Sequence, residues 1–365
     1  MPDSRVEKEA YTLVSLGYNV IILAWDRRDD YKEKKDEIIV VGRTIPIFRL
    51  GYKATYGEGF RNIVPYLNFQ ISMCGWLIKN RRKYDAIHAC DFDTAFFSYV
   101  INKFLKKKFV FDIFDFICGD PKNLFQKIVK GLQLHIINHA TGTIICTEER
   151  LNQIKGSRPR ELAVIHNSPF IELSAKKKVK RQSASMKKSV VYVGILQEHR
   201  LLKEISQFFV NNSDIELHIG GFGKFEEYFN DLAKECDNIL YYGKLKYDET
   251  ISLETDCDII LAIYDPAIEN HLFAAPNKFY EGLMLGKPLI MVRGTGMSDV
   301  VAKNDIGELI DYSQADFEKG LYKLIDRYDE WSGIKIRSET LYHRDYAWSI
   351  MKKRLYKFYK KIFIN

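Results

Sequence analysis

The chain has 365 residues, of which 46% are hydrophobic and 28% charged, so it is long enough for about two buried cores. These values exclude a disordered, a collagen-like and a small disulfide-rich protein. The 55 Lys and Arg exceed the 48 Asp and Glu, giving a net charge of +7. This mild excess suits an anionic substrate, an acidic membrane surface or nucleic acid, and composition does not choose among them.

The cysteines and the apolar segments bear on the cellular compartment in which the protein is found. The six cysteines are scattered and include no Cys-x-x-Cys pair of the kind that holds a metal. No uncharged apolar run reaches the roughly 18 residues that a membrane-spanning helix needs. The N-terminus has no apolar signal-peptide core. We therefore expect a cytoplasmic protein with reduced thiols.

Short apolar strands alternate with amphipathic helices along the first half, a pattern typical of parallel α/β sheets. The expected helices are 4–15, 62–80, 95–105, 124–139 and 148–154, and the expected strands are 18–24, 38–41, 86–88, 108–112, 143–146 and 162–166. The first helix begins almost at once, so the buried strand that normally opens such a half is absent from these residues. Either the start lies downstream of the ancestral one, or the sheet lacks its central strand.

The periodicity stops between about 170 and 188, where the basic run Lys176–Arg181 predicts a linker or an exposed loop. A second α/β half follows, with a helix near 201–210 and strands at 189–193, 215–219, 239–242, 258–262, 288–292 and 307–310. Two similar halves joined by a linker predict an enzyme with a cleft between them.

The segment 276–290 carries the most chemical information. Asn277 can cap a helix that ends at Gly286. Such a helix start offers free N–H groups and a positive dipole end, and a bound phosphate would explain the cation of Lys278 in the first turn. Glu281, one turn in, could accept hydrogen bonds from the two vicinal hydroxyls of a ribose. An ordinary helix–strand junction accounts for the same residues equally well.

Other candidate residues follow strands. Arg200 and Lys203 are three residues apart and would share one face of the helix after strand 189–193. The glycines of 220–223 fit a tight turn at a strand end, where α/β sheets collect ligands, although a plain turn is as good an explanation. His88 ends a strand and could hydrogen-bond a sugar hydroxyl or an acceptor, or could be an ordinary buried histidine.

Two Asp-x-Asp pairs formally match a pattern in which carboxylates hold a divalent ion on a diphosphate. They are Asp91 with Asp93, and Asp256 with Asp258. Because the pattern occurs twice in one chain, it is weak. We take Asp91 and Asp93 as loop residues and expect no metal.

The block Pro276–Glu281, together with Gly286-Lys-Pro288, resembles the donor-binding helix of glycosyltransferase family 4. Members of that family are retaining enzymes of GT-B fold that use nucleotide sugars. The resemblance extends over nearly the whole chain. It includes Asp3–Ala10 with Leu16–Val20, Ile87-His88 with Asp91–Thr94, Phe111–Asp115, Ile165–Asn167, and Tyr192–Gly194 with Arg200.

The resemblance implies an α/β protein with two Rossmann-like, doubly wound domains facing a cleft. The acceptor-side domain would span 1–168, the basic linker 169–188 and the donor domain 189–340, while 341–365 would form a helix that packs back on the first domain. Glu281 would bind the donor ribose, beside Lys278 and Asn277, with Gly194 and Gly221 in the adjoining turns. Arg200 and Lys203 would neutralise the leaving diphosphate, and His88 would serve the acceptor side. No metal or cofactor is implied.

The sequence departs from the family at two positions. Phe273 stands where the family often has a Glu that contacts the transferred sugar, and Glu269 is nearby but out of register. Phe114 stands where many members have a His.

Two segments bear on the acceptor. The helix around 60–82 and the segment 348–363 mix apolar residues with clusters of Lys and Arg. Such helices lie on anionic membranes, or they pack in the core with a solvated outer face.

Taken together, we expect a hexosyltransferase-like enzyme with a UDP- or GDP-linked sugar donor. Its acceptor would be a lipid-linked or polysaccharide precursor, with no nucleic acid, and it would be cytoplasmic or peripheral on the inner membrane face. The alternatives are a non-catalytic nucleotide-sugar-binding protein or subunit, and a GT-B-type nucleotide-sugar epimerase. A nicotinamide dehydrogenase is disfavoured, because the glycines of 220–223 lack the full dinucleotide-binding spacing.

Overall fold

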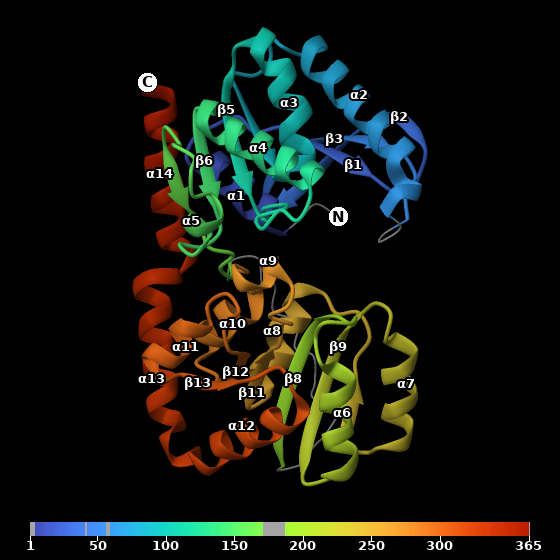
Figure 1. Cartoon of the computed structure of the whole chain (residues 1–365), viewed down its shortest axis with the longest axis vertical. Helices are drawn as coiled ribbons and strands as arrows, with labels where there is room; N and C mark the ends of the chain where they lie inside the picture. Colours follow the sequence, from blue (N-terminus) through green and yellow to red (C-terminus); the bar gives the residue numbers. More distant parts are fainter. Residues whose placement is uncertain (1–3, 41, 56–58, 171–186, 365) are drawn as a thin grey trace. The chain divides into compact units, whose positions relative to one another are not determined.

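The computed structural model describes residues 4–40, 42–55, 59–170 and 187–364 (Figure 1). The chain forms two compact units, each described below by itself. Unit 1 comprises Met1–Ile165 with Lys352–Asn365, and unit 2 comprises His166–Met351. Most of the expected linker 169–188, namely 171–186, lies outside the described residues.

The strands of unit 1 form two sheets. The first has the order β1-β3-β2, from β1 (Ile22–Asp26), β2 (Tyr31–Val40) and β3 (Arg43–Gly51). In it β1 is parallel to β3, while β2 and β3 form an antiparallel hairpin. The second is parallel, with β4 (Ala86–Cys90), β5 (Lys108–Ile113), β6 (Gly142–Ile145) and β7 (Leu162–Val164) in that order. The division into two sheets and the strand β3 were not foreseen from the sequence.

Helices of unit 1 cover these sheets. They are α1 (Ser4–Ser15), α2 (Ile63–Lys79), α3 (Asp91–Leu105), α4 (Leu124–His139) and the short α5 (Arg150–Gln153). α1 and α4 have the predicted bounds. Asn123 caps α4 by accepting a hydrogen bond from the N–H of Gln126 at 2.9 Å, which fixes the start of this helix. α14 (Trp348–Ile364) ends in unit 1, where the Tyr359 ring lies 5.6 Å from that of Tyr18.

Unit 2 contains one continuous parallel sheet with the order β10-β9-β8-β11-β12-β13. The first strand of unit 2 in chain order, β8, is therefore an interior strand of the sheet. The strands are β8 (Lys188–Ile195), β9 (Ile215–Phe222), β10 (Ile239–Tyr241), β11 (Ile259–Ala262), β12 (Leu289–Val292) and β13 (Gly307–Ile310). β11 and β12 are uncharged and buried throughout, as expected of strands covered on both faces.

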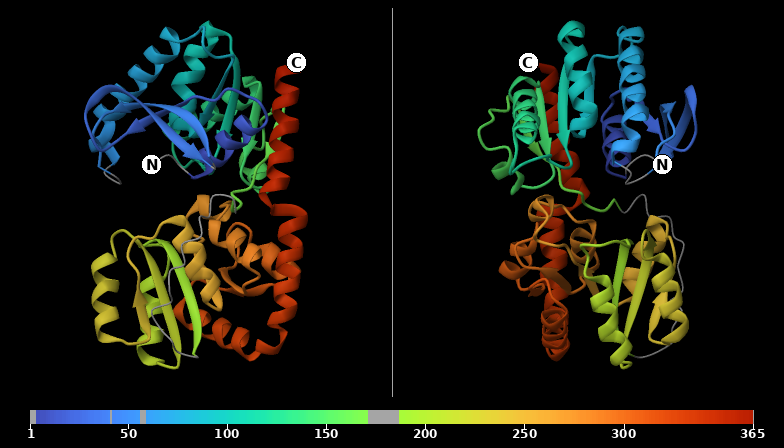
Figure 2. Two further views of the ribbon diagram at one scale, coloured as in Figure 1. Left: turned by 180° about the vertical axis from the view of Figure 1, so that it is seen from behind. Right: turned by 45° about the vertical axis from the view of Figure 1, so that its right-hand side comes forward.

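Helices pack on this sheet in two groups (Figure 1). α6 (Leu202–Asn211) packs with α12 (Gln314–Asp326), while α10 (Asn277–Leu285) packs with α8 (Tyr247–Asp256) and α13 (Trp331–Leu341). The remaining helices are α7 (Glu226–Glu235), α9 (Glu269–Leu272) and α11 (Ser298–Asn304). Figure 2 gives two further views of the same elements.

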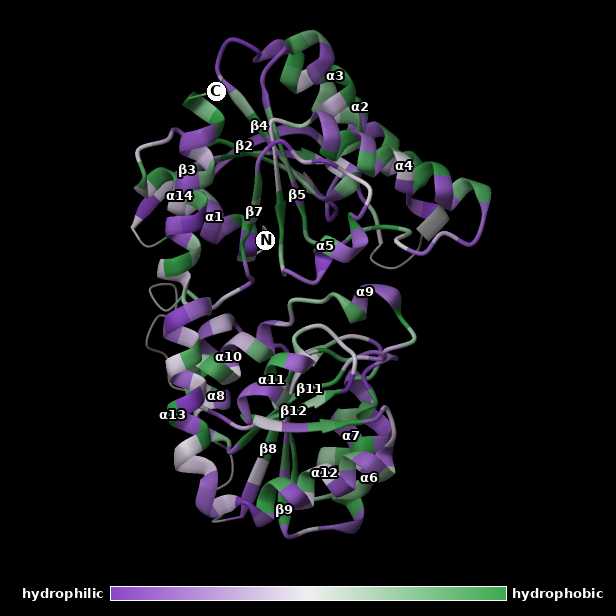
Figure 3. Ribbon diagram, turned by 60° about the vertical axis from the view of Figure 1, so that its left-hand side comes forward, coloured by the Kyte–Doolittle hydropathy of each residue, from purple (hydrophilic) through white to green (hydrophobic). Residues whose placement is uncertain are grey.

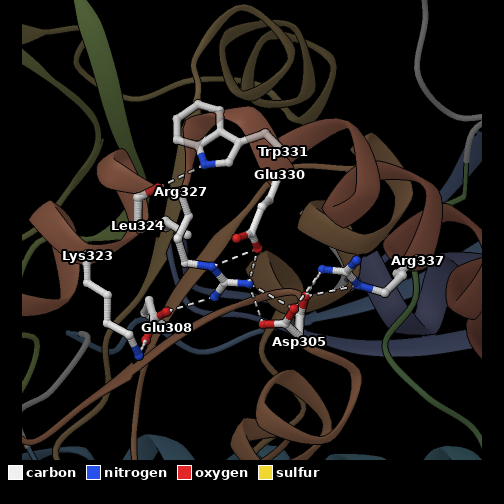
Figure 4. Close-up of polar contacts among 8 residues, drawn as sticks. All are labelled: Asp305, Glu308, Lys323, Leu324, Arg327, Glu330, Trp331 and Arg337. Atoms are coloured by element: carbon white, nitrogen blue, oxygen red, sulfur yellow. Dashed lines mark hydrogen bonds and ion pairs between the residues drawn. The ribbon is translucent and has the colours of Figure 1, made fainter.

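An ion-pair network joins the last helices of unit 2 (Figure 4). Arg327, which follows α12, binds Asp305 at 2.7 Å, Glu308 at 3.0 Å and Glu330 at 2.8 Å. Arg337 of α13 binds Asp305 as well, at 2.9 Å. Because the arginines remain partly exposed, we expect the network to fix the arrangement of α12, α13 and β13 more than to add stability.

Candidate functional site

The start of α10 places two charged side chains in the interior of unit 2. Lys278 and Glu281 are only 7% and 3% exposed. The Lys278 ammonium lies 4.4 Å from the centre of the Tyr192 ring, at the end of β8. A Cβ on Gly194 would come within 2.8 Å of the same nitrogen, so the absence of a side chain there leaves room for the cation. The helix ends at Gly286, which has a φ of +63° and suits glycine.

Lys278 stays charged despite its burial. Burial by itself lowers the pKa of a lysine, but here the phenols of Tyr192 and Tyr264 and the carboxyl of Glu281 outweigh it and raise the pKa of Lys278. A buried cation therefore stands beside the N–H groups that open α10. This combination favours a bound anion such as a phosphate.

Glu281 is surrounded by groups of α8 that the sequence analysis did not single out. Burial, and then the charge of Glu281 and a hydrogen bond to it, raise the pKa of the Tyr247 hydroxyl. Glu254 is fully buried, and neither of its carboxyl oxygens has a hydrogen-bond partner. Burial and the nearby Glu281 raise the pKa of Glu254 well above its usual value. We therefore expect Glu254 to be protonated at neutral pH, which leaves the charge on Glu281.

The glycines at the end of β9 are required by a close approach to β8. Gly221 has a φ of +141°, and a Cβ on it would lie 1.8 Å from the carbonyl oxygen of Gly194. Gly223, with a φ of +137°, meets the carbonyl oxygen of Leu196 in the same way at 2.7 Å. Only glycine fits at such positions. The structure thus brings Gly194 and Gly221 together at the carboxyl edge of the sheet.

Arg200 lies in the loop between β8 and α6, which corrects the prediction that it belongs to the helix. The loop is strained, since His199 and Leu201 have φ values of +64° and +54°. The Arg200 guanidinium stacks on Tyr264 at 4.3 Å and lies 3.0 Å from Nε2 of His271. Because His271 Nδ1 lies 2.8 Å from the carbonyl of Asp265, Nδ1 donates and Nε2 accepts from Arg200.

The two cations expected to share one helix face have different surroundings. Lys203 is exposed on α6, and its ammonium lies 4.5 Å from the Phe225 ring and 5.0 Å from the Tyr228 ring. Arg200, in contrast, is half-buried among Tyr264 and His271. Arg200 is therefore held by a ring and a hydrogen bond, whereas Lys203 is exposed beside two aromatic rings.

Asn277 and Phe273 both precede the buried pair Lys278 and Glu281 in the chain. Asn277 is exposed, and its side-chain oxygen accepts a hydrogen bond from the amide of Asn167. Tyr280 pairs with His166 at 2.9 Å, so the segment 165–167 singled out earlier supports the first turn of α10. Phe273, at the family's Glu position, ends the short helix α9 and offers no carboxylate.

His88 lies in unit 1, in a cluster of buried charges. Its Nε2 is 3.1 Å from Asp112 and 3.6 Å from Glu9, and its Nδ1 is 2.7 Å from the Tyr359 hydroxyl. Burial opposes the charged form, but the hydrogen bond and charge of Asp112 raise the pKa of His88 overall. Arg5 completes the cluster with ion pairs to Asp112 at 3.1 Å and to Glu9 at 3.2 Å. Sequence reasoning found His88 and missed Arg5 and Glu9 as its neighbours.

Three metal-ligand atoms come together at one place in the described residues, at His88, Cys90 and Asp112, within 4.8 Å of one another. The donor set fits a cation poorly. Both nitrogens of His88 have partners, the Arg5 guanidinium already binds Asp112, and burial raises the pKa of the Cys90 thiol well above its usual value.

Asp91 and Asp93 begin α3, which corrects their assignment to a loop. Asp91 accepts hydrogen bonds from the backbone N–H groups of Phe114 at 2.8 Å and Asp115 at 3.0 Å. Asp91 thus ties the start of α3 to the segment after β5. Its role in the described structure is to hold these two segments together.

Comparison with known proteins relates one segment of the chain to a family. Residues 174–332 match the model for glycosyl transferases of group 1. This segment is therefore similar to the group 1 glycosyltransferases. A search of curated protein sequences gave no match.

Solved structures similar to this chain establish the fold. Sucrose-phosphate synthase from Thermosynechococcus elongatus aligns over 99% of this chain and 93% of its own, with 12% identity and a TM-score of 0.74. The Anabaena protein HepE in complex with UDP-glucose aligns over 86% and 85%, with 13% identity and a TM-score of 0.65. WaaG, a glycosyltransferase involved in lipopolysaccharide biosynthesis, aligns over 96% and 94%, with 11% identity and a TM-score of 0.63. The chain has the GT-B fold, with two Rossmann-like domains.

Proposed function

We propose that this protein is a glycosyltransferase that moves a sugar, with retention and without a metal, from a UDP- or GDP-linked donor to a lipid-linked or glycan acceptor. The observation that carries the proposal is the buried pair at the start of α10, where Lys278 stands beside Gly194 and Glu281 lies one turn further in. A nucleotide sugar presents a diphosphate to such a cation and two ribose hydroxyls to such a carboxylate. The complex of HepE with UDP-glucose agrees with this class of donor.

The leaving diphosphate would be stabilised by groups already held in place. Arg200 is fixed by Tyr264 and His271, and Lys278 by the Tyr192 ring. Cations that are positioned before the reaction lower the barrier without having to reorganise when charge develops on the leaving oxygens. Lys203, being exposed, would contribute through its charge but less through fixed geometry.

The acceptor side would use His88. Its imidazole bonds Asp112 and Tyr359, so it is held in one orientation, and its side chain keeps 20% exposure. Because both of its nitrogens are engaged, His88 would bind a sugar hydroxyl by exchanging the Tyr359 hydroxyl for it. On the donor side, Phe273 offers no carboxylate to the transferred sugar.

An anionic membrane surface is the proposed place of action. Hydrophobic residues recur along α2, α3 and α4 (Figure 3). Several of them have exposed side chains, and on α2 these lie along one stripe. They are Ile63, Val64, Leu67, Ile71 and Ile78 on α2, Phe104 on α3, and Leu124, Phe125 and Ile128 on α4. Lys79 ends α2, and Arg81, Arg82 and Lys83 follow it. Apolar stripes beside basic clusters bind anionic lipid headgroups. The described residues contain no helix long and apolar enough to span a membrane.

A thermal-shift screen of nucleoside diphosphates and their sugars tests the donor assignment. At saturating concentration the right donor should raise the Tm of the full chain by about 5 °C. Glu281→Ala should remove this shift, and Glu281→Gln should weaken it while preserving the volume of the side chain. Glu269→Gln, on α9, is the matched control and should keep the full shift.

The outcomes separate the candidate functions. No shift with any nucleotide, or an equal shift in Glu281→Ala, would refute the donor site. A shift without transfer to any glycan or lipid-linked acceptor would favour the non-catalytic binding protein. A new sugar nucleotide formed without acceptor would favour the epimerase. Inversion at the anomeric carbon, read by NMR of the product, would refute retention.

A further inference from the structure

Two histidines lie one turn apart on an exposed face at the end of α4. His135 and His139 are both exposed, and their ring centres are 4.1 Å apart with the rings tilted by 30°. Side chains four residues apart on a helix lie on the same face and can meet. Two imidazoles at this spacing are an arrangement with which helices bind transition metals.

A hydrogen bond fixes which nitrogen of His139 carries the proton. Its Nδ1 lies 2.8 Å from the carbonyl oxygen of His135, so Nδ1 donates to that oxygen. The lone pair of the ring is therefore on Nε2, which bonds no residue in the described part of the chain. Metal-binding histidines usually donate their other N–H to a carbonyl or a carboxylate in this way. His139 thus has an unused ligand atom in the correct tautomer.

His135 is in contact with α3, the neighbouring helix in Figure 1. Its Nε2 lies 3.3 Å from the Tyr99 hydroxyl, and the two rings meet edge to face at 5.9 Å. Its Nδ1 bonds none of the described residues. Partial burial of the ring, and then the charges of His139 and Lys103, lower the pKa of His135. The imidazole is therefore neutral at pH 7, as a metal ligand must be.

The donor atoms determine which metals such a site would select. Imidazole suits Zn²⁺, Ni²⁺ and Cu²⁺, whereas Mg²⁺ and Ca²⁺ favour oxygen ligands. The pair supplies two ligands, and water would complete the coordination. Lys103 of α3, whose ammonium lies 5.2 Å from the centre of the Tyr99 ring, repels a cation here, so we expect a moderate affinity.

We propose that His135 and His139 form a surface site for one divalent transition-metal ion. One nitrogen of each ring would bind the ion, and because both side chains are exposed, the rings can turn until their lone pairs meet it. Both ligands come from the end of α4, so a bound ion would hold the last turns of this helix and, through His135 and Tyr99, tie them to α3. The site is separate from sugar transfer, for which no metal is proposed.

Calorimetric titration of the full chain with Ni²⁺ and with Mg²⁺ at neutral pH, with the cysteines kept reduced, tests this site. The variants are His135→Ala and His139→Ala. His343→Ala, at an exposed histidine of unit 2, is the matched control. Hydrogen exchange of α4 with and without Ni²⁺ locates the binding. The Tm without metal verifies that each variant is folded, which we expect because all three positions are exposed.

We expect each of His135→Ala and His139→Ala to lower the affinity for Ni²⁺ about tenfold or more, since one remaining imidazole cannot hold the ion between two ligands. His343→Ala should bind Ni²⁺ like the parent, and Mg²⁺ should not bind at the pair. In the parent alone, Ni²⁺ should slow exchange at 135–139 several-fold.

Several results would overturn the proposal. They are no Ni²⁺ binding by the parent, unchanged affinity in either variant of the pair, an equal loss in His343→Ala, and unchanged exchange at the end of α4. The thermal shift given by the sugar nucleotide should persist in both variants of the pair, so failure of this site is distinguishable from failure of the proposed function.

Discussion

The two units arrange their parallel strands differently. Unit 2 surrounds its first strand, β8, with five others in one sheet, and the ends of β8 and β9 carry the glycines that admit Lys278. The described residues of unit 1 form two separate sheets, and Arg5 and Glu9 of α1 reach Asp112 and His88 in the second of them. The candidate site in unit 2 thus depends on close backbone approach, whereas the cluster around His88 depends on side-chain ion pairs.

Replacing glycines in the two units should have opposite effects. Gly221→Ala places a Cβ 1.8 Å from the Gly194 carbonyl at a φ of +141°, so we expect a loss of about 3 kcal/mol or more in the free energy of unfolding. Gly75→Ala, on the exposed side of α2 with nothing near the new Cβ, should gain about 0.5–1 kcal/mol. Urea unfolding measures both.

A tolerated Gly221→Ala would show that β8 and β9 can separate. The close approach would then not be what shapes the donor site.

The two cations of unit 2 should differ in their effect on transfer. Arg200→Ala removes a guanidinium held by Tyr264 and His271, and we expect kcat/KM to fall about 100-fold. Lys203→Ala removes an exposed ammonium and should cost less than about 10-fold. Steady-state transfer to the acceptor found in the screen measures both losses. Similar losses in the two variants would show that the fixed position of Arg200 does not decide its contribution to transfer.

The buried carboxyls of the two units should give the protein a pH-dependent stability. Burial, and then Asp112, raise the pKa of Glu9 to about 8, and burial and Glu281 raise that of Glu254. Each folded-state pKa exceeds the unfolded value, so the folded protein binds more protons and stability falls as pH rises above about 4.5. For Glu9 this loss is complete only above about pH 8.

Glu254→Gln should remove the contribution of Glu254 to this fall of stability with rising pH. The neutral amide needs no proton, so the variant should gain about 1–2 kcal/mol over the parent at pH 8 and little at pH 5. Urea midpoints at the two pH values measure it. An equal difference at both would mean that Glu254 does not titrate in this range.

The smallest effect on stability is expected at the apolar stripe of unit 1. Ile71 is 70% exposed on α2, so Ile71→Ser should change the free energy of unfolding by less than about 0.5 kcal/mol. It should nevertheless weaken binding to phosphatidylglycerol vesicles several-fold. Ile336→Ser, at a 66% exposed position of unit 2, is the matched control and should bind vesicles like the parent. Equal losses, or no vesicle binding by the parent, would refute the membrane surface.

Much of the fold was readable from local patterns. The predicted helix 124–139 has the bounds of α4, and the predicted strands 258–262 and 288–292 contain the short apolar runs of β11 and β12. β3 was missed, since its pairing with β2 depends on a hairpin turn at Gly42 that gives no helical or strand periodicity of its own.

The site was readable only in part. The sequence of 276–281 predicts a helix start that carries a cation and a carboxylate. The structure places both side chains in the interior of unit 2. Glu254 and Tyr247 could not be found, because they reach Glu281 from another helix. Arg200 was assigned to a helix because nothing local shows that Leu201 adopts a left-handed conformation, a position where glycine is usual.

The central claim is that unit 2 alone carries the donor site. Hydrogen exchange of the full chain, with and without the nucleoside diphosphate that gives the largest thermal shift, tests it most directly. The account predicts new protection at 194–203, 220–224 and 276–281, and none in the strands of unit 1. Protection confined to unit 1, or absent from the start of α10, would contradict it.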